Sequence, residues 1–346
     1  MRGVVVPQHG GVEVLSYRVD LPDPLPGKGE VVVQVSWAGM NYIDTLVRKG
    51  YPGISIPLPH IPGGDIAGKV VELGEGVDRD WLGRRVIIYP VVWCGDCPLC
   101  REGKVNLCLK WRFFGLHIKG GYGERVVVPV QNLIPLPDKM TEREGACLPV
   151  AGLTAFHALV TVGNLKPGQV FLTWGGAGGV GTIAIQIAKQ IGAQVIGIGS
   201  DERRLQLMKD LGCDQVVNRL RQSVVEEVLK NYPYGVDLIL DFGGTETFPQ
   251  SFQMLKRGAR LVVCGIITGR EVSPFSIHQT YLRHLSILGI YLGVPQELKE
   301  LVRWVENGWV KPHIGAEFAL SEARQAHQAL EEGGILGKGL LAVGGE

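Results

Sequence analysis

The spacing of apolar and polar residues divides the chain into two regions of different texture. Up to about residue 150, short β-branched runs bounded by Gly and Pro predict a mostly β region, with strands at 31–35, 85–89 and 125–128. Beyond it, strand patterns alternate with helical patterns, which is typical of a doubly wound parallel sheet. Strands of this second region are expected at 170–174, 194–198, 236–241, 260–265 and 286–291.

The C-terminal part of the chain continues with two amphipathic helices, at 297–307 and 322–332, and a last strand at 339–343. We expect this tail to pack on the first region. The sequence therefore predicts an α/β protein with two domains. The mostly β domain covers 1–152 and 293–346, and the doubly wound domain covers 153–292.

Composition and charge narrow the class of protein. The chain has 346 residues, of which 45% are hydrophobic and 20% charged, so it can bury a large core. A net charge of +1 argues against a nucleic-acid partner. The sequence offers neither an apolar run that could span a membrane nor a signal peptide's apolar core. Cysteine usage fits a reducing compartment, and we expect a cytoplasmic protein.

Four of the seven cysteines form a C-x2-C-x2-C-x7-C cluster within a lobe at 90–112. They are Cys94, Cys97, Cys100 and Cys108. Four thiolates are what a closed tetrahedral zinc site needs. An iron–sulfur cluster is an alternative, although ferredoxin spacing ends in a short gap and Cys-Pro. Disulfides fit a reducing compartment poorly. We expect one structural zinc per chain.

A glycine-rich turn follows the strand-like run 171–174 and precedes a helical run at 182–191. The motif comprises Gly176, Gly178, Gly179, Val180 and Gly181. In a G-x-G-x-x-G turn, Gly176 would permit the tight turn, Gly178 the approach of a pyrophosphate, and Gly181 the packing of helix on strand. The helix dipole would face the phosphates. A purely structural glycine turn is the alternative.

The cofactor type depends on the end of the second strand of this domain. An NAD-binding site would offer a carboxylate there, but this chain has Gly199, followed by Ser200, Arg203 and Arg204. Guanidinium groups suit a 2′-phosphate, so we expect NADPH. Asp201 would favour NAD if the strand ended later, and the two arginines could equally form a solvated helix face.

Five segments together resemble the medium-chain dehydrogenase/reductase superfamily over essentially the whole chain. They are 39–44, 62–68, the four cysteines, 152–155 and 176–181. The resemblance implies a GroES-like catalytic domain beside a Rossmann domain, with Thr154 as a cofactor contact.

The chain departs from the zinc alcohol dehydrogenases of this superfamily at the catalytic-zinc site. Where the zinc alcohol dehydrogenases of this superfamily place catalytic-zinc ligands, this chain has Asn41, Gly64 and Val150. Ile43 stands at the position of the proton-relay hydroxyl. Only Asp65 could still bind a metal, and one carboxylate beside an amide is a poor zinc site. We therefore infer that no catalytic zinc is present.

Residues 41–45 with 63–65 instead resemble the quinone oxidoreductase branch, which implies a zinc-free site and NADPH. A zinc lobe is unusual in that branch. Arg219 stands where the branch often contacts the 2′-phosphate, although an exposed loop arginine is an equal alternative. Such relatives imply a homodimer or homotetramer.

Without a Lewis acid, a conjugated acceptor is the easier substrate, because its developing charge spreads onto oxygen. We expect Asn41 and Tyr42 to donate hydrogen bonds to that oxygen, with Tyr42 or solvent supplying the proton, and Asp44 to order the loop. A simple turn network is the alternative role for all three. The predicted function is NADPH-dependent reduction of quinones or enones. An alcohol dehydrogenase and a non-catalytic NADPH-binding sensor or structural protein are the other hypotheses.

Overall fold

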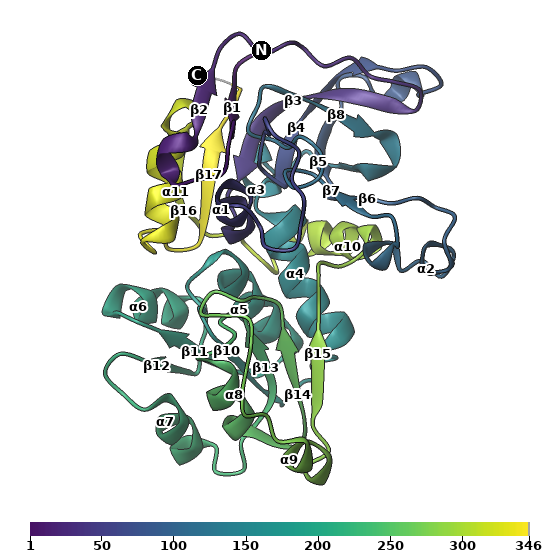
Figure 1. Cartoon of the computed structure of the whole chain (residues 1–346). Coiled ribbons are helices and arrows are strands. Elements are labelled where there is room, and N and C mark those ends of the chain that lie inside the picture. Colours follow the sequence, from purple (N-terminus) through teal and green to yellow (C-terminus); the bar gives the residue numbers. More distant parts are fainter. Residues whose placement is uncertain (345–346) are drawn as a thin grey trace. The chain divides into compact units, whose positions relative to one another are not determined.

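The structure is a computed structural model that describes residues 1–344 (Figure 1). The chain forms two compact units. Unit 1 comprises Met1–Leu153, Val294–Gly308 and the segment from Pro312 onward, and unit 2 comprises Thr154–Gly293 and Trp309–Lys311.

Unit 1 is built on a seven-stranded sheet in the order β16-β17-β3-β4-β5-β9, with β8 also paired to β3. Alternate residues Val31, Val33 and Val35 of β3 enter the core, as the two-residue period of a strand requires. The strands are β3 (Glu30–Gly39), β4 (Asp65–Leu73), β5 (Arg85–Ile88), β8 (Arg125–Pro129), β9 (Leu133–Pro135), β16 (Ile314–Ala319) and β17 (Lys338–Ala342).

The register of three of these strands brings distant parts of the chain together. Antiparallel pairing places Gly39, at the end of β3, opposite both Asp65 on β4 and Leu340 on β17. Asn41 follows Gly39 by two residues, and Lys338 precedes Leu340 by two. This corner of the sheet therefore collects side chains from three separate segments.

Shorter elements complete unit 1. Helix α10 is amphipathic and buries Leu298, Leu301, Val302 and Val305, at the spacing of one helix face. The remaining strands are β1 (Gly3–Val5), β2 (Ser16–Arg18), β6 (Val91–Val92) and β7 (Arg112–Phe113). The helices are α1 (Tyr42–Lys49), α2 (Pro98–Arg101), α3 (Glu142–Gly145), α10 (Pro295–Glu306) and α11 (Ala323–Glu331).

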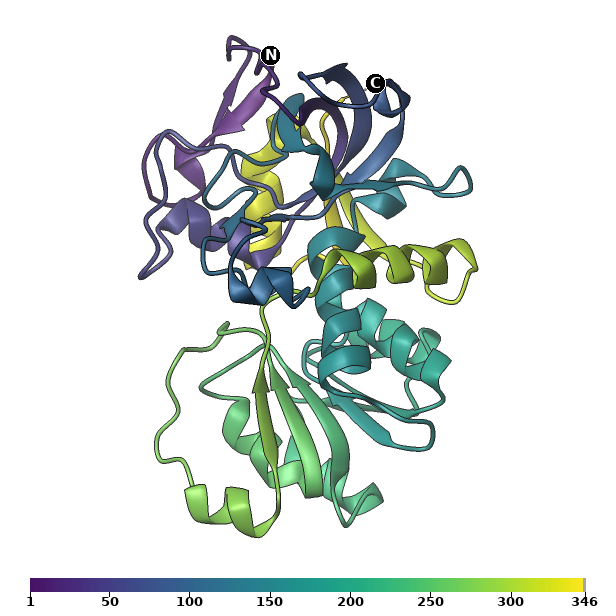
Figure 2. The same ribbon diagram turned by 90° about the vertical axis from the view of Figure 1, so that its right-hand side faces the viewer.

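Unit 2 contains a six-stranded sheet in the order β12-β11-β10-β13-β14-β15, and every strand pair in it is parallel. Figure 2 views this sheet from its β15 edge. The predicted doubly wound class is confirmed. The strands are β10 (Val170–Thr173), β11 (Gln194–Gly199), β12 (Gln215–Asn218), β13 (Val236–Asp241), β14 (Leu255–Val263) and β15 (Ser286–Gly289).

Helices connect these strands, and two boundaries differ from the sequence prediction. Helix α5 begins at Gly179 rather than at residue 182, and β14 begins at Leu255 rather than at residue 260. The early part of β14 is polar, its register against β13 is irregular, and Gly258 has a φ of 76°. For these reasons the sequence shows no regular strand pattern there. The helices are α4 (Leu153–Phe156), α5 (Gly179–Ile191), α6 (Glu202–Asp210), α7 (Val224–Asn231), α8 (Phe248–Met254) and α9 (Ile277–Leu282).

No helix within residues 1–344 combines the length and the apolar character that a membrane span would require.

Candidate functional site

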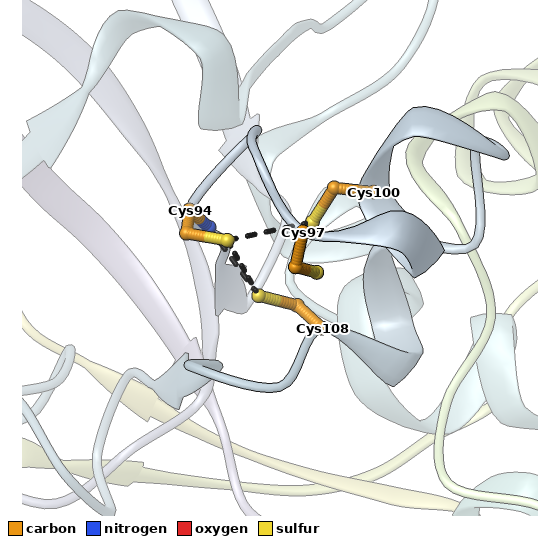
Figure 3. Close-up of side chains that lie close together, drawn as sticks. All are labelled: Cys94, Cys97, Cys100 and Cys108. Carbon is orange, nitrogen blue, oxygen red and sulfur yellow. Dashed lines mark hydrogen bonds between the residues drawn. The ribbon is translucent and has the colours of Figure 1, made fainter.

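Four thiols meet in the lobe between β6 and β7 of unit 1 (Figure 3). Cys94 Sγ lies 3.5 Å from Cys108 Sγ and 4.0 Å from Cys100 Sγ, and all four sulfurs lie within 4.8 Å of one another. A tetrahedral zinc with bonds of about 2.3 Å separates its sulfurs by slightly under 4 Å, so the cluster fits a single ion. All four cysteines are free thiols, at separations far beyond a disulfide bond. The disulfide alternative is therefore wrong.

Backbone amides surround these sulfurs. The N–H groups of Cys94 and Lys110 each donate to Cys108 Sγ at 3.3 Å. Backbone hydrogen bonds from Leu109 and Cys100 lower the pKa of the Cys97 thiol to about 6, whereas burial raises the pKa of the Cys100 thiol in the absence of a metal. Amide donors stabilise thiolates, which are the form that binds a metal. The lobe is thus prepared for a structural zinc.

A second polar cluster lies at the corner of the sheet where β3, β4 and β17 meet. Lys338 Nζ lies 2.5 Å from Asp65 Oδ2 and 2.6 Å from Asn41 Oδ1, and it also donates to Met40 O at 2.8 Å. Asn41 Nδ2 donates to Asp65 Oδ2 at 2.8 Å. Lys338 and Asp65 are 3% and 0% exposed. Asn41, Asp65 and Lys338 form a closed triangle, which we call the corner triad.

The corner triad contains Asn41, one of the three positions where the resemblance places catalytic-zinc ligands, and Asp65, which follows a second such position, Gly64. Its side chains do not suit a zinc ion. Asp65 Oδ1 accepts a hydrogen bond from the backbone N–H of Val150 at 2.6 Å, so both of its oxygens are engaged. The ammonium of Lys338 already neutralises the carboxylate. A Cβ at Gly64 would lie 2.6 Å from the Phe113 ring, so the ring blocks a side chain there. These residues offer a metal neither a free carboxylate nor a histidine.

The three predicted catalytic residues lie at the start of α1, where Asn41 is the N-cap. Asp44 accepts hydrogen bonds from the Asn41 backbone N–H at 2.8 Å and from the Tyr122 hydroxyl at 3.2 Å. Asp44 is 1% exposed, and its burial raises its pKa to about 7. These two hydrogen bonds tie Asp44 to the turn that begins α1 and to Tyr122. Tyr42, the first residue of α1, is 38% exposed.

For Asn41 the structure shows a different environment from the simple free donor that the sequence suggested. Its oxygen faces Lys338 and its nitrogen faces Asp65. The turn-network alternative is thus partly right, since the amide is a member of the corner triad. Ile43, at the proton-relay position, carries no hydroxyl.

In unit 2 the glycine motif forms the predicted strand–turn–helix. Gly178 is the N-cap of α5, and a Cβ there would approach only Gly175 O, at 3.3 Å, leaving room for a phosphate. A Cβ at Gly181 would lie 2.5 Å from Gly175 O, so close packing requires glycine. The tight turn falls at Gly175, with φ 57°, rather than at Gly176, whose Cβ would instead meet Met208. This cradle fits a dinucleotide.

The residues expected to select the cofactor meet at the end of β11. Arg219 N donates to Gly199 O at 2.9 Å, which brings Arg219 beside this end of the strand. Asp201 caps α6 by accepting from Arg204 N at 3.1 Å, and it also pairs with the Arg204 guanidinium and the Ser200 hydroxyl. The carboxylate that could have bound a ribose is thus engaged by its neighbours.

Two further residues are predicted to contact the cofactor. Arg203 is exposed on α6, as the alternative of a solvated helix face also requires. Thr154 lies in α4 and is 9% exposed.

Comparison with known proteins identifies the family. Residues 27–138 match the family model described as alcohol dehydrogenase GroES-like domain, and residues 179–307 match the one described as zinc-binding dehydrogenase. An NAD-dependent alcohol dehydrogenase of Sulfolobus acidocaldarius is 33% identical, over 94% of this chain and 95% of that protein. The chain belongs to the medium-chain dehydrogenase/reductase superfamily.

Members of this superfamily with different activities are similar to the chain. A quinone oxidoreductase of Mus musculus is 30% identical, over 99% of this chain and 98% of that protein. The crystal structure of an NAD-dependent alcohol dehydrogenase superposes with a TM-score of 0.94 at 37% identity, covering 99% of this chain and 100% of that one. The chain is therefore an oxidoreductase of the medium-chain type, with a GroES-like and a Rossmann domain.

Sequence reasoning missed Lys338, the third member of the corner triad. A signal was present, because this lysine interrupts an otherwise apolar or glycine-rich run from Ile335 to Leu341. A lone lysine in a buried strand needs a partner. The sequence did not say that the partner would be Asp65.

Proposed function

We propose that this medium-chain oxidoreductase reduces quinones or α,β-unsaturated carbonyls with NADPH and uses no catalytic zinc. The observation that carries the proposal is the corner triad. Its ammonium and carboxylate neutralise each other where a catalytic metal would need ligands. A simple carbonyl would then lack its electrophile, whereas a conjugated acceptor delocalises charge by itself.

In the proposed reaction, the conjugated acceptor delocalises the negative charge that hydride transfer creates. When bound, NADPH supplies a hydride. An enone takes the hydride at its β-carbon, and the π electrons move onto the carbonyl oxygen to give an enolate. One proton, which ends on the α-carbon, then completes the saturated ketone. A quinone takes up the hydride and one proton to give the hydroquinone. Tyr42, exposed at the start of α1, would donate to the developing oxyanion and pass on the proton, unless solvent supplies it.

The preference for NADPH rests on the end of β11. Gly199 offers no carboxylate to a ribose, and Asp201 is engaged by Arg204. Ser200, Arg203 and Arg219 leave a polar, cationic rim for a 2′-phosphate. The alternative is NAD, which the similar alcohol dehydrogenases use according to their names.

An alcohol dehydrogenase is the second candidate function, because such enzymes stand among the similar proteins. The corner triad argues against it, since alcohol oxidation in that class depends on a metal to hold the alkoxide.

One assay distinguishes these functions. Purified protein is given NADPH with a quinone, an enone or a simple aldehyde, and NADP+ or NAD+ with a primary alcohol, while absorbance of the reduced cofactor is followed. We expect turnover with the quinone or the enone and little with the alcohol. Robust alcohol oxidation that survives metal removal would overturn the proposal. Cofactor binding without turnover of any acceptor would favour a sensor.

We also propose a homodimer or homotetramer in the cytoplasm. The oligomer is supported by the edge strand β15, where Ile287 is 37% exposed, and by the preceding helix α9, where Ile277 and Tyr281 are 73% and 64% exposed. A free strand edge with apolar side chains can pair with its own copy about a twofold axis. Sedimentation of the parent and of Ile287→Lys tests it, since a lysine at the edge should lower the mass towards that of the monomer. A monomeric parent would exclude this interface.

A further inference from the structure

We propose that Lys338 is a positioning residue that fixes and polarises the Asn41 amide, so that Asn41 donates to the substrate oxyanion in place of a metal. The inference rests on the proposed function and adds to it the electrophile. It starts from one juxtaposition: Lys338 Nζ lies 2.6 Å from Asn41 Oδ1, while Asn41 Nδ2 lies 2.8 Å from Asp65 Oδ2.

The chemistry of the two neighbours determines which way the amide faces. An ammonium has only donors, so it must meet the amide oxygen. A carboxylate only accepts, so it must meet the amide nitrogen. Flipping Asn41 would place N–H against Lys338 and oxygen against Asp65, and both contacts would become repulsive. The corner triad therefore holds Asn41 in a single orientation.

That orientation leaves one donor available. Asn41 Nδ2 carries two hydrogens, of which one is used by Asp65 Oδ2. The only other acceptor near it within the described chain is Gly39 O at 3.4 Å, which is long for a hydrogen bond. Asn41 is only partly buried. A negatively charged oxygen is a stronger acceptor than this distant carbonyl, so an enolate or hydroquinone oxygen would take the second hydrogen.

Lys338 strengthens this donor without touching the substrate. Its three N–H groups are used by Met40 O, Asn41 Oδ1 and Asp65 Oδ2, and the residue is 3% exposed. Hydrogen bonds in a chain polarise one another, so a cation on the amide oxygen makes the amide N–H a better donor. The positive charge thus acts through Asn41, which is why Lys338 is a positioning and not a catalytic residue.

Fold stability alone is a weak reason for this arrangement. Burying both charges costs desolvation, and apolar replacements of buried ion pairs are often neutral or stabilising. A second lysine–aspartate pair in the chain, Lys256 with Asp237, keeps its lysine 41% exposed. That pair supplies a matched control, because it has the same chemistry outside the corner triad.

The test compares Lys338→Met, the double variant Asp65→Asn/Lys338→Met, and the control Lys256→Met, each assayed as purified full-length protein with NADPH and the best acceptor. We expect Lys338→Met to lower kcat at least about tenfold with KM for NADPH unchanged, and Lys256→Met to keep the parent kcat. The double variant removes both charges, so it should recover thermal stability but not kcat. A double variant that recovers both would show a merely structural role and overturn the inference.

Chemical rescue keeps the inference testable if Lys338→Met folds poorly. Lys338→Ala removes the equivalent of propylamine, so n-propylammonium should restore kcat in a saturable way, whereas n-propanol should not. Equal rescue by both compounds would indicate filling of space and contradict the inference. The proposed function fails if the parent reduces no conjugated acceptor. The inference alone fails if the parent is active and Lys338→Met keeps the parent rate.

Discussion

Lys338 and Asp65 form a buried ion pair, Nζ to Oδ2 at 2.5 Å, although 273 positions separate them in the sequence. The carboxylate comes from the first residue of β4 and the ammonium from the first residue of β17, with β3 between them. The pair places a fixed cation beside Asn41, with Lys338 Nζ 2.6 Å from Asn41 Oδ1.

Zinc content should be one equivalent per chain, held by the four cysteines of the lobe. In Cys94→Ser/Cys108→Ser we expect the bound zinc to fall to near zero and thermal stability to drop, because metal binding contributes folding free energy. Cys213→Ser, which changes a cysteine of unit 2, is the control and should keep the metal. Elemental analysis by mass spectrometry measures the ratio. A second tightly bound equivalent in the parent would contradict the absence of a catalytic site.

Asp44 should make stability fall as pH rises. Burial raises its pKa to about 7 in the folded state, above its usual value near 4, so between these values the folded protein binds more protons than the unfolded chain. Stability is then fully present below about pH 4 and is lost towards pH 7. Asp44→Asn should remove this component, worth up to about 4 kcal/mol. Urea unfolding of both proteins at pH 5 and pH 8 checks it, and an equal difference at both pH values would refute the prediction.

Cofactor preference should depend on the cationic rim at the end of β11. Replacing Arg203 and Arg204 together with alanine removes Arg203 from the rim and releases the Asp201 carboxylate from the Arg204 guanidinium. This should weaken NADPH binding at least about tenfold and NADH binding much less, because charge-assisted hydrogen bonds to phosphate are worth about 1.5–3 kcal/mol. Lys209→Ala, at the far end of α6, is the matched control and should leave both affinities unchanged. Cofactor fluorescence titration gives the dissociation constants. Equal affinity of the parent for NADH and NADPH would show that the site does not select.

The Tyr42 hydroxyl should contribute to the rate. Tyr42→Phe keeps the ring and removes a donor, and an oxyanion donor in a protected site is worth about 3–4 kcal/mol, so we expect a fall in kcat of up to about 10²–10³. Because Tyr42 is 38% exposed, solvent can replace part of this effect. Tyr17→Phe, on β2 and 39% exposed, is the control. Steady-state reduction of the best acceptor measures the effect, and full activity of Tyr42→Phe would assign proton delivery to solvent.

Local patterns in the sequence predicted much of this protein. The C-x2-C-x2-C-x7-C spacing predicted a tetrathiolate lobe, because ligands within a short segment reach one another without help from the rest of the fold. The glycine motif predicted its strand–turn–helix for the same reason, since each glycine is needed where the backbone turns tightly or packs closely against residues nearby in the sequence. Even there, the positive φ fell one residue earlier, at Gly175, because it depends on how the turn meets the strand.

Only the tertiary structure decided which side chains surround Asn41. The sequence showed that Asn41, Gly64 and Val150 are poor ligands, but it did not show that Lys338 contacts Asn41 and Asp65. That contact depends on the register of β17 against β3 and of β3 against β4, which is determined by packing over the whole sheet. Composition and periodicity predict that a strand forms, whereas the partner of a buried charge is chosen by which distant strand lies beside it.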